Sequence, residues 1–388
     1  MFAEHCIDDR GDMSTDTGTP TWLRTYNDRG AFRLFLEHGP LSRSRLGKLS
    51  GMSKPTAGQM IARLERIGLI SPVGEVTGAR GPNAITYGAR PDSMTGVAIS
   101  ILADRIEAVL VDPTDTEHPI ANLSTDDVER TPIADVNRAV DAACLAAGVP
   151  RESVSLIAIG VQAAVDADAD RLSFVDTLPG WPAQGARALI EQSTGFATKI
   201  ENDVNLAAEA ERAITEEADF VFLWLGSGLG SGIDVDGVVR RGAAGSAGEI
   251  GYVEVPRSAA ALDPSAVDFT DLLGGPAIRA LLGSPDANLA TALTSLPGNE
   301  PALAELAARV HLLFNVLVAV LDPACVVLGG PTGLAGGDRL AELVQARVPD
   351  SPVRVRASRA GDEPVLQGAR HLLVANIRER LEAAIAAS

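Results

Sequence analysis

The sequence predicts an α/β protein in two parts, a small basic N-terminal domain and a larger body of alternating strands and helices. Its length of 388 residues suits two or three domains. From about residue 95 onward, short apolar runs alternate with amphipathic segments, which is the pattern of an α/β domain. Positive charge is concentrated in the first ninety residues, although the whole chain carries a net charge of −18.

The composition argues against several other classes of protein. Apolar residues make up 46% of the chain and charged residues 22%, as in globular proteins. Polar residues interrupt the longest apolar run, Val310–Leu321, so we expect no membrane span. The first residues lack a basic region followed by an apolar run, so no secretory signal is expected. The three cysteines, Cys6, Cys144 and Cys325, are far apart, which favours a cytoplasmic protein without a disulfide framework.

The charge divides the chain into three segments. Residues 1–21 carry −4 and are rich in Asp, Thr, Gly and Ser, which predicts a disordered tail. Residues 22–90 contain eleven Lys or Arg and four Asp or Glu, a net charge of +7. Residues 91–388 carry −21. A basic domain on an acidic body is expected when one end of a protein binds a polyanion, although chance clustering on a solvated face is the alternative.

Residues 22–90 show the spacing of a helix-turn-helix. A helical pattern begins at Asp28 and ends before Gly39-Pro40, and a second short helix is predicted from Ser42 to Gly51. Gly51-Met52-Ser53 forms the turn to a third helix, which the Ser53 hydroxyl can cap. A short helix, a turn containing glycine and a further helix make up this motif, whose last helix enters the major groove of DNA.

The third helix is predicted to have an apolar and a polar face. Ala57, Ile61 and Leu64 have the i, i+4, i+7 spacing that packs against the preceding helices. The opposite residues are polar, and an ordinary solvated helix face is the alternative to a DNA-binding one. The residues that we expect to contact DNA are Ser53, Lys54, Thr56, Gln59, Arg63 and, from the segment described next, Arg80.

Two short strands follow the third helix, at Leu69–Val73 and Ala84–Tyr87. The loop between them contains Arg80-Gly81-Pro82. Glycine allows the backbone to approach a ligand closely, and an arginine can enter a narrow minor groove. We therefore predict a hairpin wing, which makes residues 22–90 a winged helix-turn-helix domain; the alternative role for Arg80 is a single phosphate contact.

The body begins after a predicted hinge at Pro91-Asp92 and reads as two lobes around a cleft. The predicted strands are Thr95–Leu102, Arg105–Val111, Val154–Val161, Ala197–Ile200, Phe220–Leu225 and Cys325–Leu328. The predicted helices are Pro132–Ala147, Ala183–Ser193, Asp203–Ile214, Pro301–Leu321 and Arg370–Ala387.

Four short segments of the body stand out. Gly226–Gly232 follows an apolar strand and could turn N–H groups toward a phosphate, although such segments also make tight hairpins. Glu201–Asn205 lies at a strand end, and Gly245–Gly251 and Leu328–Pro331 come later. In this order and spacing, the segments resemble the ROK family of bacterial sugar kinases and sugar-responsive regulators.

The N-terminal residues are similar to the regulator branch of that family, through Gly39–Arg43, Met52–Thr56 and Arg80–Pro82. The resemblance covers residues 22–388. It implies a two-lobed, actin-like ATPase body, a homodimer or homotetramer, and transcription controlled through a carbohydrate ligand.

The chain departs from the kinase pattern of the family at its first phosphate motif. Ala98 stands where family kinases have an aspartate, and Ser100 and Ile101 replace two glycines. Branched Ile101 prevents the close backbone approach that glycine allows. Phosphoryl transfer needs firmly held phosphates, so we expect that the kinase chemistry is lost and that the protein is not an enzyme.

The resemblance also identifies candidate effector-binding residues. Asp203 matches the catalytic aspartate, Asn202 its sugar-hydroxyl partner, and Glu249 a second sugar-contacting residue. The alternative for Asp203 is a helix cap. Tyr252 replaces a zinc-binding histidine, and Pro256–Asp271 contains neither Cys nor His, so we expect no metal and no other cofactor.

The sequence therefore predicts a transcriptional regulator that binds double-stranded DNA and responds to a sugar or phosphosugar. We expect a dimeric repressor of carbohydrate-related genes. A sugar kinase, and a regulator whose body only dimerises, are the two alternatives.

Overall fold

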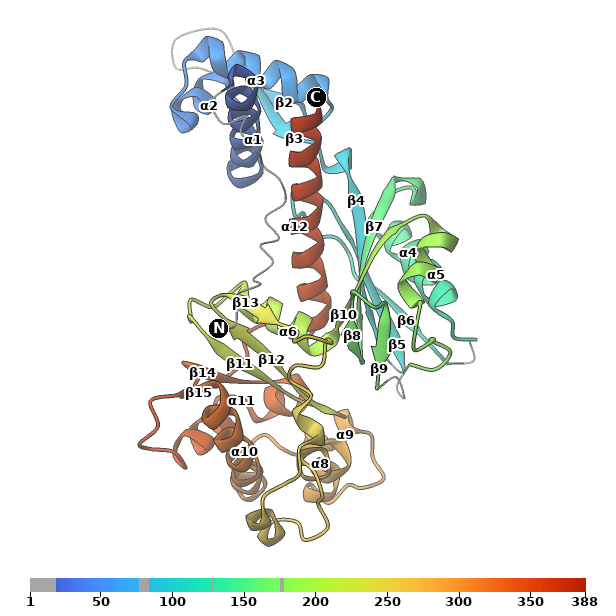
Figure 1. The fold of residues 1–388 in the computed structure, drawn as a ribbon, viewed down its shortest axis with the longest axis vertical. Coiled ribbons are helices and arrows are strands. Elements are labelled where there is room, and N and C mark those ends of the chain that lie inside the picture. The colour runs from blue at the N-terminus through green and yellow to red at the C-terminus, as the bar shows by residue number, and fades with distance from the viewer. Residues whose placement is uncertain (1–18, 77–83, 103, 127–128, 175–177) are drawn as a thin grey trace, which may run out of the picture. The chain divides into compact units, whose positions relative to one another are not determined.

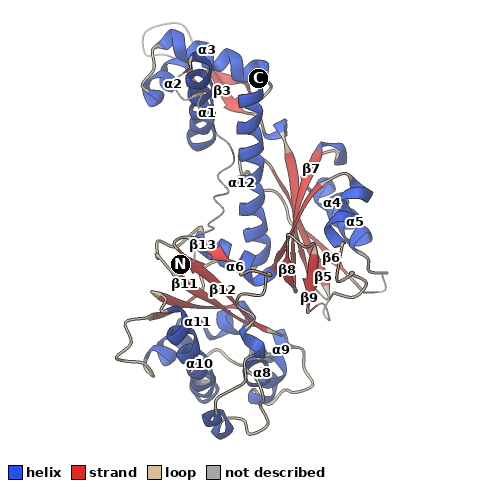
Figure 2. Ribbon diagram, viewed as in Figure 1, coloured by secondary structure: helices blue, strands red, loops and turns tan. Residues whose placement is uncertain are grey.

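The computed structural model describes residues 19–76, 84–102, 104–126, 129–174 and 178–388. The chain divides into two compact units, whose elements are drawn in Figures 1 and 2. The first unit contains the residues up to Thr95, together with Asp112–Thr116 and Val374–Ser388. The second unit contains Gly96–Val111 and Glu117–Leu373.

Helices and a small antiparallel sheet make up the N-terminal part of the first unit. The elements are α1 (Pro20–His38), β1 (Leu41–Ser42), α2 (Arg43–Ser50), α3 (Lys54–Arg66), β2 (Ile70–Val76), β3 (Ala84–Ala89) and the 3-10 turn η1 (Pro91–Ser93). Strand β3 lies between β1 and β2.

Helix α1 begins earlier than the sequence pattern indicates. The Thr19 hydroxyl accepts a hydrogen bond from the Trp22 amide at 3.2 Å and caps the helix, which then starts at Pro20 instead of Asp28. The prediction of a disordered tail over residues 1–21 is therefore wrong for its last two residues. Residues 1–18 of that tail lie outside the described part of the chain.

The predicted caps of the second and third helices are confirmed. Ser42 and Ser53 each accept the backbone amide three residues later, at 3.3 Å in both cases. Gly51 ends α2 in the left-handed conformation, with φ of 69°, which a residue with a Cβ adopts only with strain. The predicted apolar face of α3 is buried, and α3 contacts both α1 and α2, where Phe35 and Leu46 are also buried.

A buried ion pair joins α1 to α3. Arg63 donates from Nε and Nη2 to the two carboxylate oxygens of Asp28, at 2.6 and 2.7 Å. The Asp28 side chain is only 7% exposed and that of Arg63 is 25% exposed. Because this bidentate pair is largely screened from water, it fixes the position of α3 on α1 more firmly than a surface ion pair would.

The second unit contains two five-stranded sheets. The first sheet has the order β10-β7-β4-β5-β6, with α4 and α5 packed into its apolar core. Its strands are β4 (Thr95–Ile101), β5 (Arg105–Val111), β6 (Ala121–Ser124), β7 (Val154–Val161) and β10 (Ala197–Asn202); the helices are α4 (Pro132–Ala147) and α5 (Ala186–Thr194). The turn η2 (Arg151–Ser153) and the hairpin strands β8 (Ala164–Asp166) and β9 (Arg171–Ser173) lie between these elements in sequence.

The second sheet has the order β13-β12-β11-β14-β15, and helices α7 to α11 contribute to its core. Its strands are β11 (Phe220–Leu225), β12 (Leu229–Val235), β13 (Val238–Arg240), β14 (Cys325–Gly329) and β15 (Arg354–Ala357). Its helices are α7 (Phe269–Leu273), α8 (Gly275–Leu281), α9 (Leu289–Leu293), α10 (Glu300–Leu321) and α11 (Gly330–Gln345). The turns η3 (Ile250–Tyr252) and η4 (Arg257–Ala261) follow β13.

Two further helices complete the described chain. Helix α6 (Asp203–Arg212) follows β10 directly and packs mainly on β12. Helix α12 (Pro364–Ala387) starts six residues before the predicted helix at Arg370 and has residues in both units.

One helix of the described chain, α10, is long and apolar enough to cross a membrane by those two criteria alone. Core helices meet the same criteria. Leu306, Val310, Leu313 and Phe314 of α10 are fully or almost fully buried in the core around the second sheet, as in a core helix.

The glycine-rich segment Gly226–Gly232 forms a hairpin in which only residues 226–228 are loop. Gly230 and Gly232 lie in β12, where added Cβ atoms would come within 3.1 Å of Val204 and 2.5 Å of Ala208 on α6. These two glycines are therefore needed for helix packing on the sheet, so the suggested phosphate-binding role does not explain them.

We predict that Asp28→Asn lowers the free energy of unfolding by about 2 kcal/mol, because it leaves the partly buried Arg63 guanidinium without its counterion. Equilibrium urea unfolding measures this loss. The matched control is Asp92→Asn, since Arg90 binds Asp92 in the same forked geometry, at 3.0 and 2.7 Å, but both side chains are exposed. The control should leave stability unchanged within error, and equal losses in the two variants would contradict the argument.

Candidate functional site

The first candidate site is a surface formed by α2 and α3. A shallow depression of about 440 Å³ is lined by Arg43, Lys54, Pro55, Gly58, Gln59 and Ala62. Lys54, Gly58 and Ala62 are four residues apart and so lie along one stripe of α3. Gly58 and Ala62 have little or no side chain, so the surface of α3 is hollow there. Lys54 lies at one end of this hollow, and the Gln59 amide lies beside it.

The structure brings only some of the predicted DNA contacts together. Lys54 and Gln59 are exposed and line the depression. Ser53 is exposed at the start of α3, but its hydroxyl serves as the helix cap and also lies 2.8 Å from the Thr56 hydroxyl. Thr56 is half-buried, and this contact with Ser53 already occupies its hydroxyl.

Arg63 does not join Lys54 and Gln59 at the depression, because the buried carboxylate of Asp28 holds its guanidinium. The expectation that Arg63 reads base edges thus loses its geometric support. Arg80 lies in the segment 77–83, outside the described residues. Sequence reasoning missed Arg43, which lines the depression and donates to the Tyr87 hydroxyl at 3.2 Å; its place one residue after the Ser42 cap was the available signal.

The second candidate site lies in the second unit, where β10 ends and α6 begins. Asn202 is the N-cap of α6: its Oδ1 accepts the Asn205 amide at 2.9 Å, and its Nδ2 donates to the Ala163 carbonyl at 3.0 Å. Asp203 is the first residue of the helix itself, so the suggested capping role belongs to Asn202. The Asn202 side chain thus caps α6 and also links the start of this helix to Ala163, just after β7.

Asp203 is a buried acid next to a second acid. Its Oδ1 accepts the amide of Val204 at 2.9 Å. Burial is the main cause that raises the pKa of Asp203 from 3.8 to about 7, and the nearby Glu249 carboxylate raises it as well. Burial also raises the pKa of the half-buried Glu249. Near neutral pH this pair can both donate hydrogen bonds to hydroxyl groups and accept them.

A glycine-rich loop brings Glu249 to this position. Gly245 and Gly248 have φ of 73° and 92°. An added Cβ at either glycine would lie 1.9 Å from a backbone oxygen, that of Val165 or that of Ser231. No side chain can be accommodated there, so the loop passes tightly between β8 and β12 and reaches the start of α6.

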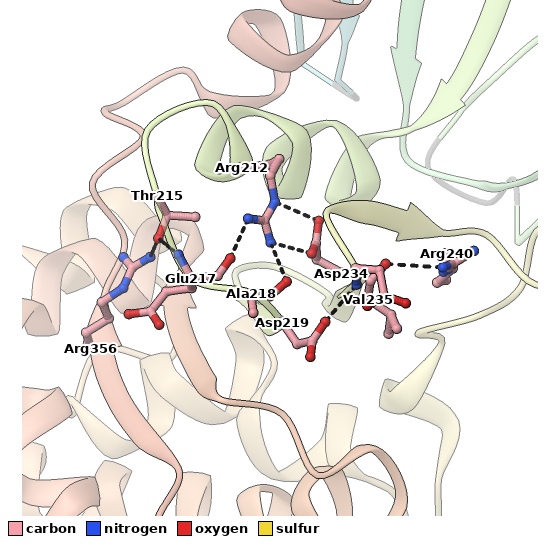
Figure 3. Close-up of polar contacts among 10 residues, drawn as sticks. Arg212, Thr215, Glu217, Ala218, Asp219, Asp234, Val235, Arg240 and Arg356 are labelled. Carbon is pink, nitrogen blue, oxygen red and sulfur yellow. Dashed lines mark hydrogen bonds and ion pairs between the residues drawn. The ribbon is translucent and has the colours of Figure 1, made fainter.

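The far end of α6 is fixed by Arg212 (Figure 3). Arg212 Nε donates to Asp234 of β12 at 2.9 Å, and Nη1 donates to the Glu217 carbonyl at 2.5 Å. The Asp234 side chain is completely buried. Arg356 of β15 adds a hydrogen bond to the Thr215 hydroxyl at 3.2 Å. Because both ends of α6 are held, Asp203 has a fixed position before any ligand arrives.

The first phosphate motif of family kinases has no acidic counterpart here. Ala98 and Ser100 are buried in β4, and Ile101 belongs to the apolar core of the first sheet. Tyr252, at the position of the family's zinc-binding histidine, stacks on Phe174 with ring centroids 4.7 Å apart. In the described ranges, no group of three or more His, Cys, Asp or Glu side chains could hold a metal ion.

Residues 97–376 match the model of the ROK family. The chain belongs to the ROK family. Among curated relatives, the xylose repressor of Bacillus spizizenii is 20% identical over 249 residues, which is 62% of this chain and 63% of that protein. The bifunctional enzyme NanE/NanK of Brucella suis is 31% identical over 151 residues, 37% of this chain and 28% of that enzyme. The chain thus spans less than two thirds of the length of either relative.

Solved structures share the fold of this ROK protein. A ROK family transcriptional regulator, described as a homologue of the E. coli MLC protein, has a TM-score of 0.67 at 17% identity, over 94% of this chain and 99% of its own. The ROK hexokinase from Thermus thermophilus has a TM-score of 0.56 at 23% identity, over 73% of this chain and 100% of its own. The body therefore has the actin-like α/β fold of ROK sugar kinases.

We predict that the contribution of Asp203 to stability falls as the pH rises from about 4 to 7, because folded Asp203 keeps its proton to about pH 7 while the unfolded chain releases it near 3.8. Asp203→Asn should remove most of this slope and raise the free energy of unfolding at pH 8, on the order of 3 kcal/mol, with little effect below pH 4. Glu249, whose pKa is also raised by burial, still contributes a slope of the same sign in the variant.

Urea unfolding of the wild type and the variant at pH 4, 6 and 8 measures the effect. Exposed Asp286 supplies the control, because Asp286→Asn should leave the pH profile unchanged. An Asp203→Asn profile parallel to that of the wild type would show that Asp203 titrates normally.

Proposed function

We propose that this ROK protein is a transcriptional regulator that binds double-stranded DNA through α2 and α3. The observation that carries the proposal is the exposed set of Arg43, Lys54 and Gln59 around the depression on a capped helix. The surrounding residues 22–90 carry a net charge of +7 in a chain of −18, so a polyanion is attracted to this end of the protein.

In this proposal residues 22–90 are a winged helix-turn-helix domain, and α3 enters the major groove. The Gln59 amide can contact an adenine edge in a bidentate manner, and Lys54 and Arg43 can contact phosphate or guanine. The hairpin of β2 and β3 is the wing, and Arg80 in its loop contacts the minor groove. Residues 91–388 serve as the effector and oligomerisation domain of a homodimer or homotetramer that binds an inverted repeat.

We further propose that Asn202, Asp203 and Glu249 bind a sugar or phosphosugar effector. Relatives named xylose repressors support a repressor of carbohydrate-related genes. We place this repressor in the cytoplasm, where its DNA lies. The two acids with raised pKa values suit the hydroxyl groups of a sugar. The effector would release DNA by binding one arrangement of the oligomer more tightly than the other.

A sugar kinase is the second candidate function. A buried aspartate with a pKa of about 7 fits a general base near neutral pH, and one relative is named an N-acetyl-D-glucosamine kinase. Ala98 argues against this function, because a methyl group cannot replace the aspartate that handles phosphate in the first motif of family kinases. We therefore favour the regulator over the kinase.

We predict that Gln59→Ala relaxes base preference at one operator position, at a cost of about 1–3 kcal/mol for the preferred base. Lys54→Ala should instead weaken binding to all sequences and lower the salt slope by about one. Selection from random duplexes, followed by titrations at several salt concentrations, separates these effects. The control is Gln192→Ala, which changes an exposed glutamine in the second unit. Equal, weak affinity of the wild type for every duplex would contradict the proposal.

We predict that D-xylose, D-glucose or one of their phosphates raises the melting temperature of the wild type, because a ligand that binds only the folded state stabilises it. Asp203→Ala should abolish this shift. A flat response with intact DNA binding would indicate a regulator without an effector. Sugar-dependent ADP release in a coupled assay would establish the kinase in place of the regulator.

A further inference from the structure

Arg241 contacts two acids near the proposed effector site, one in β10 and one in α6. Arg241 Nε donates to Glu201, and Nη2 donates to Glu209 at 3.3 Å. A third donor of the same guanidinium, Nη1, binds the Val239 carbonyl at 3.2 Å. The sequence analysis placed Glu201 at a strand end, in the segment Glu201–Asn205, but assigned no role to Glu201 or to Arg241.

Glu201 belongs to the framework that positions the site. Its side chain is only 5% exposed. Its Oε1 accepts the amide of Asn202 at 3.1 Å and the Nδ2 of Asn205 at 3.2 Å. A carboxylate removed from water in this way needs a cation, and Arg241 is the cation that contacts it. The charge of Arg241 is therefore coupled to the junction where β10 becomes α6.

Arg241 also begins the loop that carries Glu249. The carbonyl of Arg241 accepts the amide of Ala247 at 3.1 Å, which closes residues 242–246 into a ring. Gly242 has φ of 76°, so the chain reverses immediately after Arg241. The guanidinium consequently holds the base of this ring to β10 and α6, while the other end of the loop leads through Gly248 to Glu249.

We propose that Arg241 is the positioning residue of the effector site: it holds the loop of residues 241–249 on the β10–α6 junction, and so keeps Glu249 beside Asp203. This assignment deepens the proposed effector function and rests on it. Arg241 acts through Glu201 and Glu209, and it need not touch the ligand. Without its cation, the base of the loop loses its link to the junction, and the spacing between the two halves of the site is held less firmly.

The neighbouring Arg240 provides a matched control. It is one residue away and has the same charge, but its side chain is exposed and donates to the Val235 carbonyl at 3.2 Å (Figure 3). Hydrogen exchange detected by mass spectrometry on the full-length protein should show about tenfold faster exchange in residues 242–249 for Arg241→Gln, and no change for Arg240→Gln. Arg241→Lys should restore part of the protection, because it keeps the cation but loses the fork.

Equal exchange in Arg241→Gln and Arg240→Gln would overturn the assignment. So would faster exchange spread evenly over the second unit, since it would mean a general loss of stability. Should Arg241→Gln fail to fold, Glu209→Gln carries the test, because it removes the partly exposed partner and leaves Glu201 paired. Faster exchange confined to 242–249 in that variant supports the assignment, and unchanged exchange opposes it.

Calorimetric titration with D-xylose separates this inference from the proposed function. If the wild type binds D-xylose, Arg241→Gln should weaken binding at least tenfold while Arg240→Gln binds normally. If neither protein binds the sugar, that result counts against D-xylose as the effector, and the exchange measurement still decides the role of Arg241.

Discussion

Helix α6 is held by paired charges at places that water hardly reaches, and the arrangement of the second unit depends on them. Arg212 binds the fully buried Asp234 at one end of the helix, and Arg241 binds the nearly buried Glu201 just before the other. A buried ion pair contributes little net stability compared with apolar packing, but loss of one partner is costly. Here the ion pairs fix geometry, since a guanidinium donates to a carboxylate in only a few orientations.

That fixed helix gives the acids at its start unusual properties. The backbone of Asp203 is the first turn of a helix anchored at both ends, and its side chain is buried there. It responds to burial by holding its proton to about pH 7. A flexible loop at the same point would let the carboxylate reach solvent and ionise normally. The acid chemistry of the site is therefore a property of the packing around α6.

The secondary structure was largely predictable because it depends on local patterns. The predicted strands Arg105–Val111, Val154–Val161 and Phe220–Leu225 agree with the structure to the residue, since each is a buried apolar run. The early start of α1 was missed because its first turns bury little apolar surface: Trp22, Leu23 and Tyr26 are exposed. No periodicity marks such turns, and the local signals were the Thr19 cap and the proline that follows it.

The side-chain partners were less predictable than the helices that carry them. Helical spacing placed Arg63 on a polar face of α3, but spacing contains no information about a carboxylate 35 residues earlier in the chain. Asn202 and Asp203 were found through the family resemblance, whereas their division of roles, cap and buried acid, required the backbone geometry. Neither Arg43, although it belongs to the matched segment Gly39–Arg43, nor Arg241 was given a role, because solvated arginines are common and only three-dimensional contacts distinguish these two.

The glycines of β12 have a consequence for how such sequences are compared. Val204 and Ala208 leave no room for a side chain at Gly230 or Gly232, whether or not a nucleotide ever binds nearby. Selection for packing alone would preserve this signature long after a phosphate site had decayed. If two relatives share these glycines, the match therefore indicates common descent. It does not indicate that both proteins catalyse the same reaction.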